Sequence, residues 1–217
     1  MRIFSAGNLT DADFDQILSF LRSGGVIGFP TDTAYGLGAD PYNDAALRRI
    51  FAIKGRPETK PILLLVDSME MVERIAVVSR EARLLAEHFW PGPLTMVLPA
   101  LDNAPRTLTA GGRSIGVRMP DAPFARRLTS ALAKPVTATS ANRSSRPACV
   151  TAEEVQAQLG AELDVLIDGG ALPARGGSTV LDLTTDPPLL VREGPTSLKS
   201  LNEILSGRIL RKTDSTQ

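Results

Sequence analysis

The sequence is poor in the residues that build metal centres, disulfides and base-stacking surfaces. Its 217 residues include one cysteine, one histidine and one tryptophan, and aromatic residues make up 5%. The single Cys149 cannot form an internal disulfide, and the single His88 cannot build a histidine metal cluster. No apolar run approaches the roughly 20 residues that a membrane-spanning helix requires. We therefore expect a protein without a disulfide framework, located in a reducing cytoplasm.

The sequence also lacks an excess of either charge, because 24 Lys and Arg residues balance 24 Asp and Glu residues. A neutral total argues against a protein that coats DNA or membranes, although it allows a local basic cleft. The opening residues, MRIFSAGNLTDADFD, turn acidic early and contain no apolar segment typical of a signal peptide. We expect a soluble protein that is not exported and does not bind a membrane.

What the sequence does contain is 43% hydrophobic residues, enough for a substantial core in a single domain of this length. Apolar residues at helical spacing alternate with short apolar runs, as in residues 14–21 followed by residues 26–29. Because helices do not fall between all pairs of strands, we predict a single α/β domain with a twisted, mixed β-sheet and packed helices. We expect this domain to span residues 1–206, followed by a disordered polar tail over residues 207–217.

Two polar strings stand at the ends of predicted core elements, KGRP at 54–57 and SAN at 140–142. In the first string the glycine is expected to end a helix, and the proline disfavours helical conformation in the residue before it. Lys54 and Arg56 are therefore expected to be exposed at a helix exit, where both can reach a ligand. Two cations facing a hydroxyl and an amide would suit an anionic ligand such as a nucleoside triphosphate.

Each string also has an ordinary structural interpretation. Lysine and arginine are favoured at helix C-termini by the helix dipole, and serine and asparagine are frequent in turns. The joint occurrence of the two strings at the ends of core elements favours a binding site. A glycine-rich segment, residues 169–178, is likewise either a plain turn or a lid that closes over a ligand.

Several strings in a fixed order carry a resemblance to a known family. FPTDTAYGLG, KGRPETKP, TSAN, IDGG, GGSTVLDL and LLVREG resemble the YrdC-type threonylcarbamoyl-AMP synthase family over residues 10–205. The resemblance implies a short, single-domain YrdC-like fold and an L-threonylcarbamoyladenylate synthase, a nucleotidyltransferase. Such enzymes make threonylcarbamoyl-AMP from L-threonine, bicarbonate and ATP and release pyrophosphate. The product feeds the transferase machinery that forms threonylcarbamoyladenosine in tRNA.

The resemblance also implies roles for individual positions. The catalytic tetrad corresponds to Lys54, Arg56, Ser140 and Asn142. The ATP contacts correspond to Arg56, Lys60, Ser114, Ser140 and Arg192. The threonine contacts correspond to Thr33, Ala138 and Ser178, with Thr31, Tyr35 and Arg118 as further candidates. We expect no metal site built from protein side chains, because Mg²⁺ would be bound through ATP and water.

At two positions the sequence departs from the family pattern. Leu65 stands where longer relatives often have a histidine that contacts threonine, and Ala148 stands where they often have a serine. These differences leave open a paralogue of the same fold that acts on another carbamoyl or acyl acceptor.

A further alternative is an RNA-binding module with a basic concavity. Its candidate residues are Arg113, Arg118, Arg143 and Arg146. The scarcity of aromatic residues disfavours recognition of bases by such a module.

Overall fold

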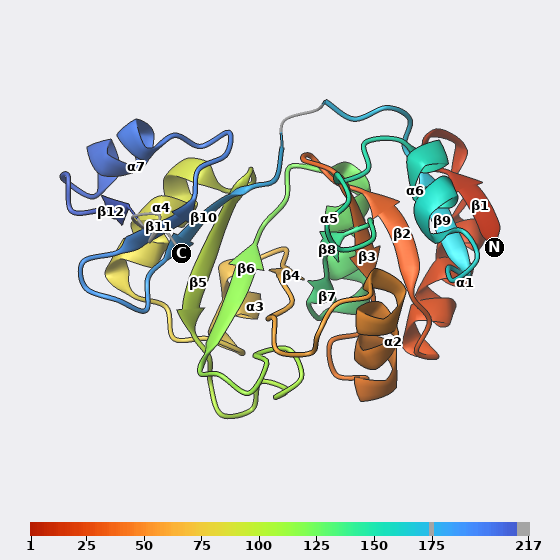
Figure 1. The fold of residues 1–217 in the computed structure, drawn as a ribbon, viewed down its shortest axis with the longest axis horizontal. Coiled ribbons are helices and arrows are strands. Elements are labelled where there is room, and N and C mark those ends of the chain that lie inside the picture. The colour runs from red at the N-terminus through yellow and green to blue at the C-terminus, as the bar shows by residue number, and fades with distance from the viewer. Residues whose placement is uncertain (174–175, 212–217) are drawn as a thin grey trace.

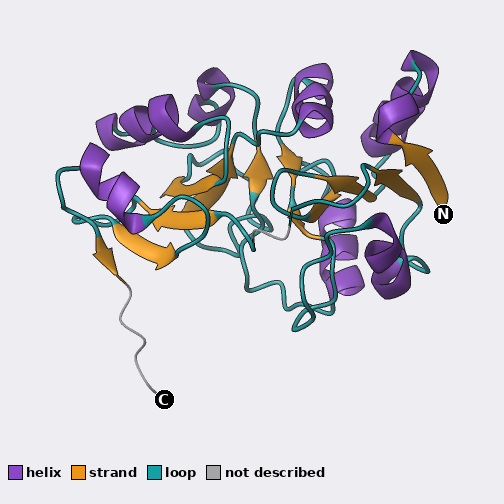
Figure 2. Ribbon diagram, turned by 90° about the horizontal axis from the view of Figure 1, so that it is seen from above, coloured by secondary structure: helices purple, strands orange, loops and turns teal. Residues whose placement is uncertain are grey.

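A computed structural model describes residues 1–173 and 176–211 of the chain. Its strands form two sheets, and helices pack on both sides of the strands (Figures 1 and 2). The helices are α1 (Asp11–Arg22), α2 (Asp44–Lys54), α3 (Met69–Glu73), α4 (Arg80–Phe89), α5 (Pro123–Leu132), α6 (Ala152–Leu159) and α7 (Leu198–Ile204). The strands are β1 (Arg2–Ser5), β2 (Ile27–Pro30), β3 (Tyr35–Gly38), β4 (Leu64–Leu65), β5 (Leu94–Pro99), β6 (Ser114–Arg118), β7 (Val136–Thr137), β8 (Thr139–Ser140), β9 (Val165–Asp168), β10 (Thr179–Asp182), β11 (Leu189–Arg192) and β12 (Leu210–Arg211).

The predicted mixed α/β class is confirmed, but the strands divide between two sheets instead of forming one. The first sheet has the order β1-β9-β2-β3-β8, and the second has the order β12-β11-β10-β5-β6-β4-β7. Strand β2 pairs parallel with β9 and antiparallel with β3. Strand β5 likewise pairs parallel with β10 and antiparallel with β6, so each sheet is mixed.

The chain passes from one sheet to the other at Ala138. The sequence predicts one strand over residues 136–139, whereas β7 pairs with β4 in the second sheet and β8 pairs with β3 in the first. The Ala138 N–H donates instead to the carbonyl oxygen of Leu63 at 2.9 Å. This break brings β8 and the segment before β4 together between the sheets.

The helix ends follow the signals in the sequence. Thr10 and Thr151 form capping boxes at the starts of α1 and α6. Gly55 adopts the left-handed conformation after α2, with φ of 58°, and thereby ends the helix as predicted. Among the described residues, no helix combines the length and the apolar character needed to cross a membrane.

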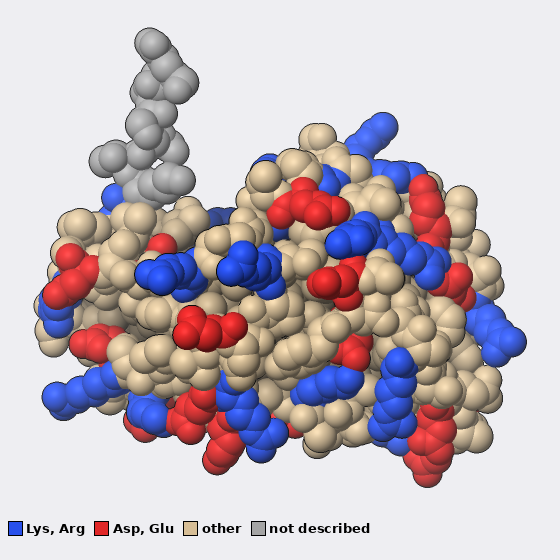
Figure 3. Space-filling view, turned by 90° about the horizontal axis from the view of Figure 1, so that it is seen from below, with Lys and Arg blue, Asp and Glu red and all other residues tan. Residues whose placement is uncertain are grey.

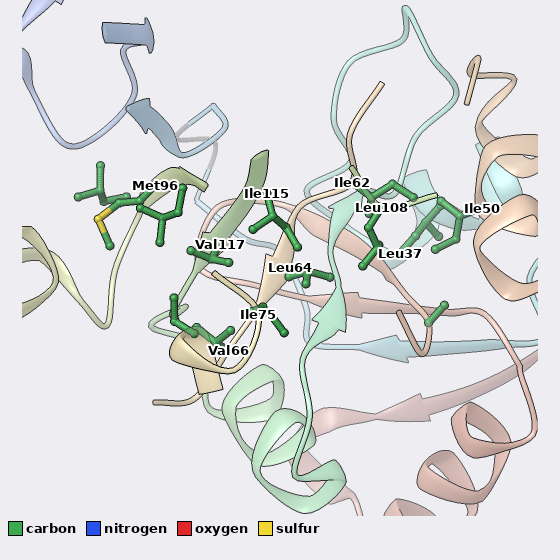
Figure 4. Close-up of a cluster of buried hydrophobic side chains, with 14 of the residues drawn as sticks. Leu37, Ile50, Ile62, Leu64, Val66, Ile75, Met96, Leu108, Ile115 and Val117 are labelled. Carbon is green, nitrogen blue, oxygen red and sulfur yellow. The ribbon is translucent and has the colours of Figure 1, made fainter. Parts of the chain in front are cut away.

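Buried side chains connect the two sheets. The larger hydrophobic cluster joins residues of β3 and α2 to residues of β5 and β6. Figure 4 follows this cluster from Met96 and Val117 to Leu37 and Ile50. A second cluster packs α1 and α5 against the first sheet. The position of each sheet is therefore fixed by a core that the other sheet shares.

Ordered structure continues beyond residue 206, where the sequence predicts the tail to begin. Strand β12 (Leu210–Arg211) pairs parallel with β11 at the edge of the second sheet. The polar composition of this segment does not indicate a strand, because its pairing depends on β11, about twenty residues earlier. Residues 212–217 lie outside the described residues.

Candidate active site

A cavity of about 290 Å³ lies between the two sheets. Its walls come from the β2–β3 turn, the segments around β4, β6 and β8, and the residues beside β10 and β11. Most of the residues that the family resemblance singles out line it. They are Thr31, Thr33, Tyr35, Arg56, Arg118, Ala138, Ser140, Ala148, Ser178 and Arg192.

A larger cavity of about 690 Å³ shares Thr31 with the first one. Its walls are mostly apolar and include the start of α5, and its charged side chains are Asp32, Asp121 and Arg127. Arg127 is already paired with Asp11 at 2.6 Å. Because this cavity contains none of the expected tetrad, we place the candidate active site in the smaller one.

Three arginines, Arg56, Arg118 and Arg192, give the smaller cavity a cationic wall. Arg118 is 2% exposed, lies 3.3 Å from the Asp32 carboxylate and donates to the Thr33 hydroxyl at 3.1 Å. Among the described residues, Asp32 is the one carboxylate within ion-pair distance of these three guanidinium groups. Three cations opposed by a single carboxylate favour an anionic ligand.

Two of these guanidinium groups keep unused hydrogen-bond donors. Nε of Arg56 and Nε of Arg118 are buried and have no hydrogen-bond partner in the part of the chain that the structure describes. The other nitrogens of Arg56 donate to the Thr139 hydroxyl at 3.3 Å and to the Pro61 carbonyl at 2.8 Å. Burial lowers the pKa of Arg56, although a guanidinium remains charged. Buried donors without partners mark positions where ligand oxygens would be favoured.

Lys54 is buried, so the expectation that it is exposed at the helix exit is wrong. Its side chain is 4% exposed and does not line the cavity. The ammonium donates to the Ser140 carbonyl, to the Asn142 carbonyl at 3.0 Å and to the Asn142 Oδ1 at 3.2 Å. Burial, and secondly the charge of Arg56, lowers the pKa of Lys54 from 10.5 to about 8. Lys54 therefore fastens the end of α2 to β8 instead of facing a ligand.

Asn142 also turns away from the cavity. Its Oδ1 accepts from Lys54, while its Nδ2 donates to the Arg143 carbonyl at 2.9 Å and the Arg146 carbonyl at 2.6 Å. Its side-chain amide is thus engaged by Lys54 at the end of α2 and by carbonyls of the turn that follows β8. Ser140, two residues earlier, does line the cavity.

Two contacts fix the ends of the glycine-rich segment that follows β9. The Tyr35 hydroxyl accepts from the Gly169 N–H at 2.9 Å and donates to the Gly170 carbonyl at 2.8 Å. Burial is the main cause that raises the pKa of Tyr35 to about 12, so the phenol stays protonated. At the other end, Nε and Nη2 of Arg192 donate to the Ser178 carbonyl at 2.9 and 2.7 Å. Residues 174–175 of the predicted lid lie outside the described residues.

Of the remaining positions, Lys60, Ser114 and Leu65 lie off the cavity. Lys60 is exposed after α2, and Ser114 begins β6 at the end opposite Arg118. Leu65 is fully buried in the second hydrophobic cluster. Ala148 lines the cavity and presents a methyl group to it, without a hydroxyl.

Two polar residues of this site are not among the positions predicted from the sequence. Asp32 pairs with Arg118, and the Thr139 hydroxyl accepts from Arg56. Both stand beside predicted residues, Asp32 between two threonines and Thr139 immediately before Ser140. A buried arginine requires a carboxylate or several acceptors, and that requirement is the signal that could have identified them.

The four arginines proposed for RNA binding do not form one basic concavity. Arg118 is buried beside Asp32, and Arg143 is bound to Glu162 and to the Ile53 carbonyl. Arg113 and Arg146 are exposed. On the face shown in Figure 3, lysine and arginine side chains are interspersed with aspartate and glutamate. An extended basic surface is therefore absent from that face, within the described residues.

Comparisons with known proteins show which family model and which relatives this chain matches. The family model Sua5_yciO_yrdC, described as telomere recombination, matches residues 19–194. The chain is 40% identical over 187 residues to the threonylcarbamoyl-AMP synthase of Pyrococcus abyssi, covering 86% of this chain and 55% of the relative. It is 38% identical over 176 residues to that of Vibrio cholerae, covering 78% of this chain and 92% of the relative. The chain thus spans little more than half of the Pyrococcus relative and nearly all of the Vibrio relative.

Solved structures agree with this relationship. The structure of P. abyssi Sua5 complexed with L-threonine superposes with a TM-score of 0.92 at 35% identity, covering 100% of this chain and 66% of that one. The crystal structure of Escherichia coli YciO gives a TM-score of 0.82 at 32% identity, covering 92% of this chain and 97% of that one. The fold is therefore that of both long and short relatives.

Proposed function

Because the chain belongs to the Sua5/YciO/YrdC family, we propose that it makes threonylcarbamoyl-AMP from L-threonine, bicarbonate and ATP and releases pyrophosphate. The names of its relatives support this proposal. The observation that carries it is the convergence of Arg56, Arg118 and Arg192 with the hydroxyls of Thr33 and Ser140 on one cavity. We place the reaction in the cytoplasm, where the product would supply the machinery that modifies tRNA.

The proposed reaction has two steps. The threonine amine attacks bicarbonate, which gives a carbamate and water. A carbamate oxygen then attacks the α-phosphorus of ATP, the bond from that phosphorus to the bridging oxygen of the β-phosphate breaks, and pyrophosphate leaves. Both steps join anions and require no covalent enzyme intermediate, so alignment and charge neutralisation supply most of the acceleration.

Arg118 is suited to the threonine carboxylate. It is buried at the cavity wall, and its Nε lacks a partner among the described residues. A guanidinium in this position offers a planar pair of donors to a carboxylate. Thr33, Ala138 and Ser178 complete the proposed threonine site, with Thr31 supporting it from the turn after β2 and Tyr35 from β3.

Arg56, Ser140 and Arg192 are suited to the phosphates of ATP. The buried Nε of Arg56 has no partner among the described residues and can donate to an oxygen. Ser140 presents a hydroxyl to the same cavity. Lys60 and Ser114 lie off the cavity, so we assign them to parts of ATP that extend beyond it. Mg²⁺ would enter with ATP, held by phosphate oxygens and water.

We assign Lys54 and Asn142 an indirect role. Their side chains bond to each other and to the backbone around β8, so they would hold Ser140 in place. The positive charge of Lys54 would still strengthen the field that an anionic ligand experiences, because a buried charge is weakly screened. We further propose that residues 1–206 act as one catalytic domain, since both sheets share a core.

The test is direct detection of the adenylate by mass spectrometry. With threonine, bicarbonate and ATP together, we expect threonylcarbamoyl-AMP and equimolar pyrophosphate, and neither without threonine or bicarbonate. A panel of amino acids tests the paralogue alternative, which Leu65 and Ala148 motivate. Product formation with another acceptor and none with threonine would overturn the proposal.

A further inference from the structure

Thr95 places a hydroxyl next to the cavity without lining it. The residue lies on β5 and is 5% exposed. Its Oγ1 lies 2.7 Å from the Oγ of Ser178, which does line the cavity. Among the residues that the structure describes, this is the one hydrogen bond that the Thr95 hydroxyl makes.

The sheet register holds the two hydroxyls together. Thr95 is paired with Val180 in the parallel ladder of β5 and β10. Ser178 precedes Val180 by two residues, so its side chain points to the same face of the sheet as that of Val180. On the other edge of β5, Met96 pairs with Val117, the residue before Arg118. Thr95 thus stands between the strands that lead to two polar residues of the cavity.

The surroundings determine the direction of this hydrogen bond. If Ser178 donated to Thr95, the Thr95 proton would be buried without an acceptor among the described residues, which is costly. If Thr95 donates, its proton is satisfied and the Ser178 oxygen accepts it. Nη2 of Arg192 lies 3.4 Å from the same oxygen and can only donate. The Ser178 proton is then left to point into the cavity.

We propose that Thr95 is a positioning residue that makes the Ser178 hydroxyl a hydrogen-bond donor to the substrate. The substrate atom facing Ser178 is then an acceptor oxygen and not an ammonium group. That this substrate is threonine rests on the proposed function. Thr95 contributes to threonine binding through Ser178 alone and does not touch ATP or threonine.

The test compares Thr95→Val, which keeps the shape and removes the hydroxyl, with Thr95→Ser, which keeps the hydroxyl. Pyrophosphate release should show the KM for threonine raised about tenfold in Thr95→Val, the loss expected for one hydrogen bond. The KM for ATP should stay within twofold and kcat within threefold. Thr95→Ser should restore the wild-type KM for threonine.

Thr129→Val is the matched control. Thr129 is equally buried, and its hydroxyl donates to the backbone of α5, with the Arg126 carbonyl at 3.0 Å. It lies outside the cavity, so both KM values should remain unchanged. Melting temperatures of all variants separate a loss of binding from a loss of fold.

The same Thr95→Val substitution made in a Ser178→Ala protein tests whether Thr95 acts through Ser178. In the Ser178→Ala protein, adding Thr95→Val should leave the KM for threonine unchanged, because the mediating hydroxyl is already gone. A full tenfold effect in that background, or an unchanged KM in Thr95→Val alone, would overturn the inference. So would an equal rise in both KM values.

Calorimetric titration with threonine, without ATP, repeats the comparison without turnover. If the wild type binds threonine and Thr95→Val binds it more weakly, the inference is supported. If no adenylate forms in addition, only the proposed reaction is rejected. Absence of threonine binding by the wild type overturns both.

Discussion

Replacing Lys54 with methionine removes a buried charge while keeping the length of the side chain. Both oxygens of Asn142 lose the donor that Lys54 supplies, whereas the Ser140 carbonyl keeps the N–H of Asn142 as a donor. Each unsatisfied buried acceptor costs about 1–3 kcal/mol. The opposing effect is relief of a buried charge. Lowering the pKa of Lys54 from 10.5 to about 8 corresponds to about 3 kcal/mol at neutral pH. Two such acceptors cost about 2–6 kcal/mol together, so we expect the free energy of unfolding at pH 7 to change by at most about 3 kcal/mol.

The pH dependence of stability separates the two proteins. Between about pH 8 and pH 10.5 the unfolded chain retains the Lys54 proton that the folded protein has lost. Stability rises with pH wherever the unfolded state binds more protons, so this group adds stability to the wild type across that interval. The methionine variant lacks the titration. Urea unfolding at pH 7 and pH 10 should show the wild type gaining up to about 3 kcal/mol relative to the variant.

Activity should respond far more strongly than stability at pH 7. Without Lys54, Ser140 loses its anchor and the cavity loses a weakly screened charge, so we expect pyrophosphate release to fall about 100-fold. Lys199→Met, which changes an exposed lysine, is the control and should leave both measurements unchanged. A Lys54→Met enzyme within threefold of the wild type would refute the anchoring role. Identical pH dependence of stability in the wild type and in Lys54→Met would refute the claim that Lys54 carries a buried charge with a lowered pKa.

Substitutions at three further positions test the site and the sheets. Arg56→Lys should raise the KM for ATP at least tenfold in a pyrophosphate-release assay, because an ammonium cannot reproduce the planar fork; an unchanged KM would remove Arg56 from the ATP site. Asn142→Ala and Asn142→Asp should each lower the free energy of unfolding by about 1–3 kcal/mol in urea titrations. The aspartate should in addition abolish the rise in stability above pH 8, and a retained rise would contradict the contact with the buried ammonium. Gly38→Ala should lower the free energy of unfolding by about 1–3 kcal/mol, because a Cβ would lie 2.8 Å from the Phe29 ring. Gly7→Ala is the control because no atom lies within 4 Å of a Cβ there, and equal stability of the two variants would contradict this prediction.

The parts of the fold that depend on local sequence could be predicted. The apolar spacing of residues 14–21 predicts a helix there, and α1 spans Asp11–Arg22. The glycine at 55 ended α2 because only its local conformation was needed. These features depend on residues within one or two helical turns of each other, because helix capping and termination are local interactions.

The parts that depend on distant partners could not be predicted. Residues 62–66 read as a continuous apolar strand, yet only Leu64–Leu65 pair, with β6 on one side and β7 on the other. Strand β1 (Arg2–Ser5) exists because β9 lies beside it, and its sequence has no strong strand signal. Ala138 gives no local indication that the chain changes sheets there. In each case the outcome is decided by a neighbour more than fifty residues away.

The two polar strings show how this limit affects the site. Spacing of two residues would point both side chains of each pair in the same direction if the backbone were extended. The left-handed Gly55 and the end of β8 break that alternation, so only Arg56 and Ser140 reach the cavity. Lys54 and Asn142 instead bond to each other across 88 residues of sequence. One member of each pair, Arg56 or Ser140, faces the cavity, and the other members join the two segments into one support.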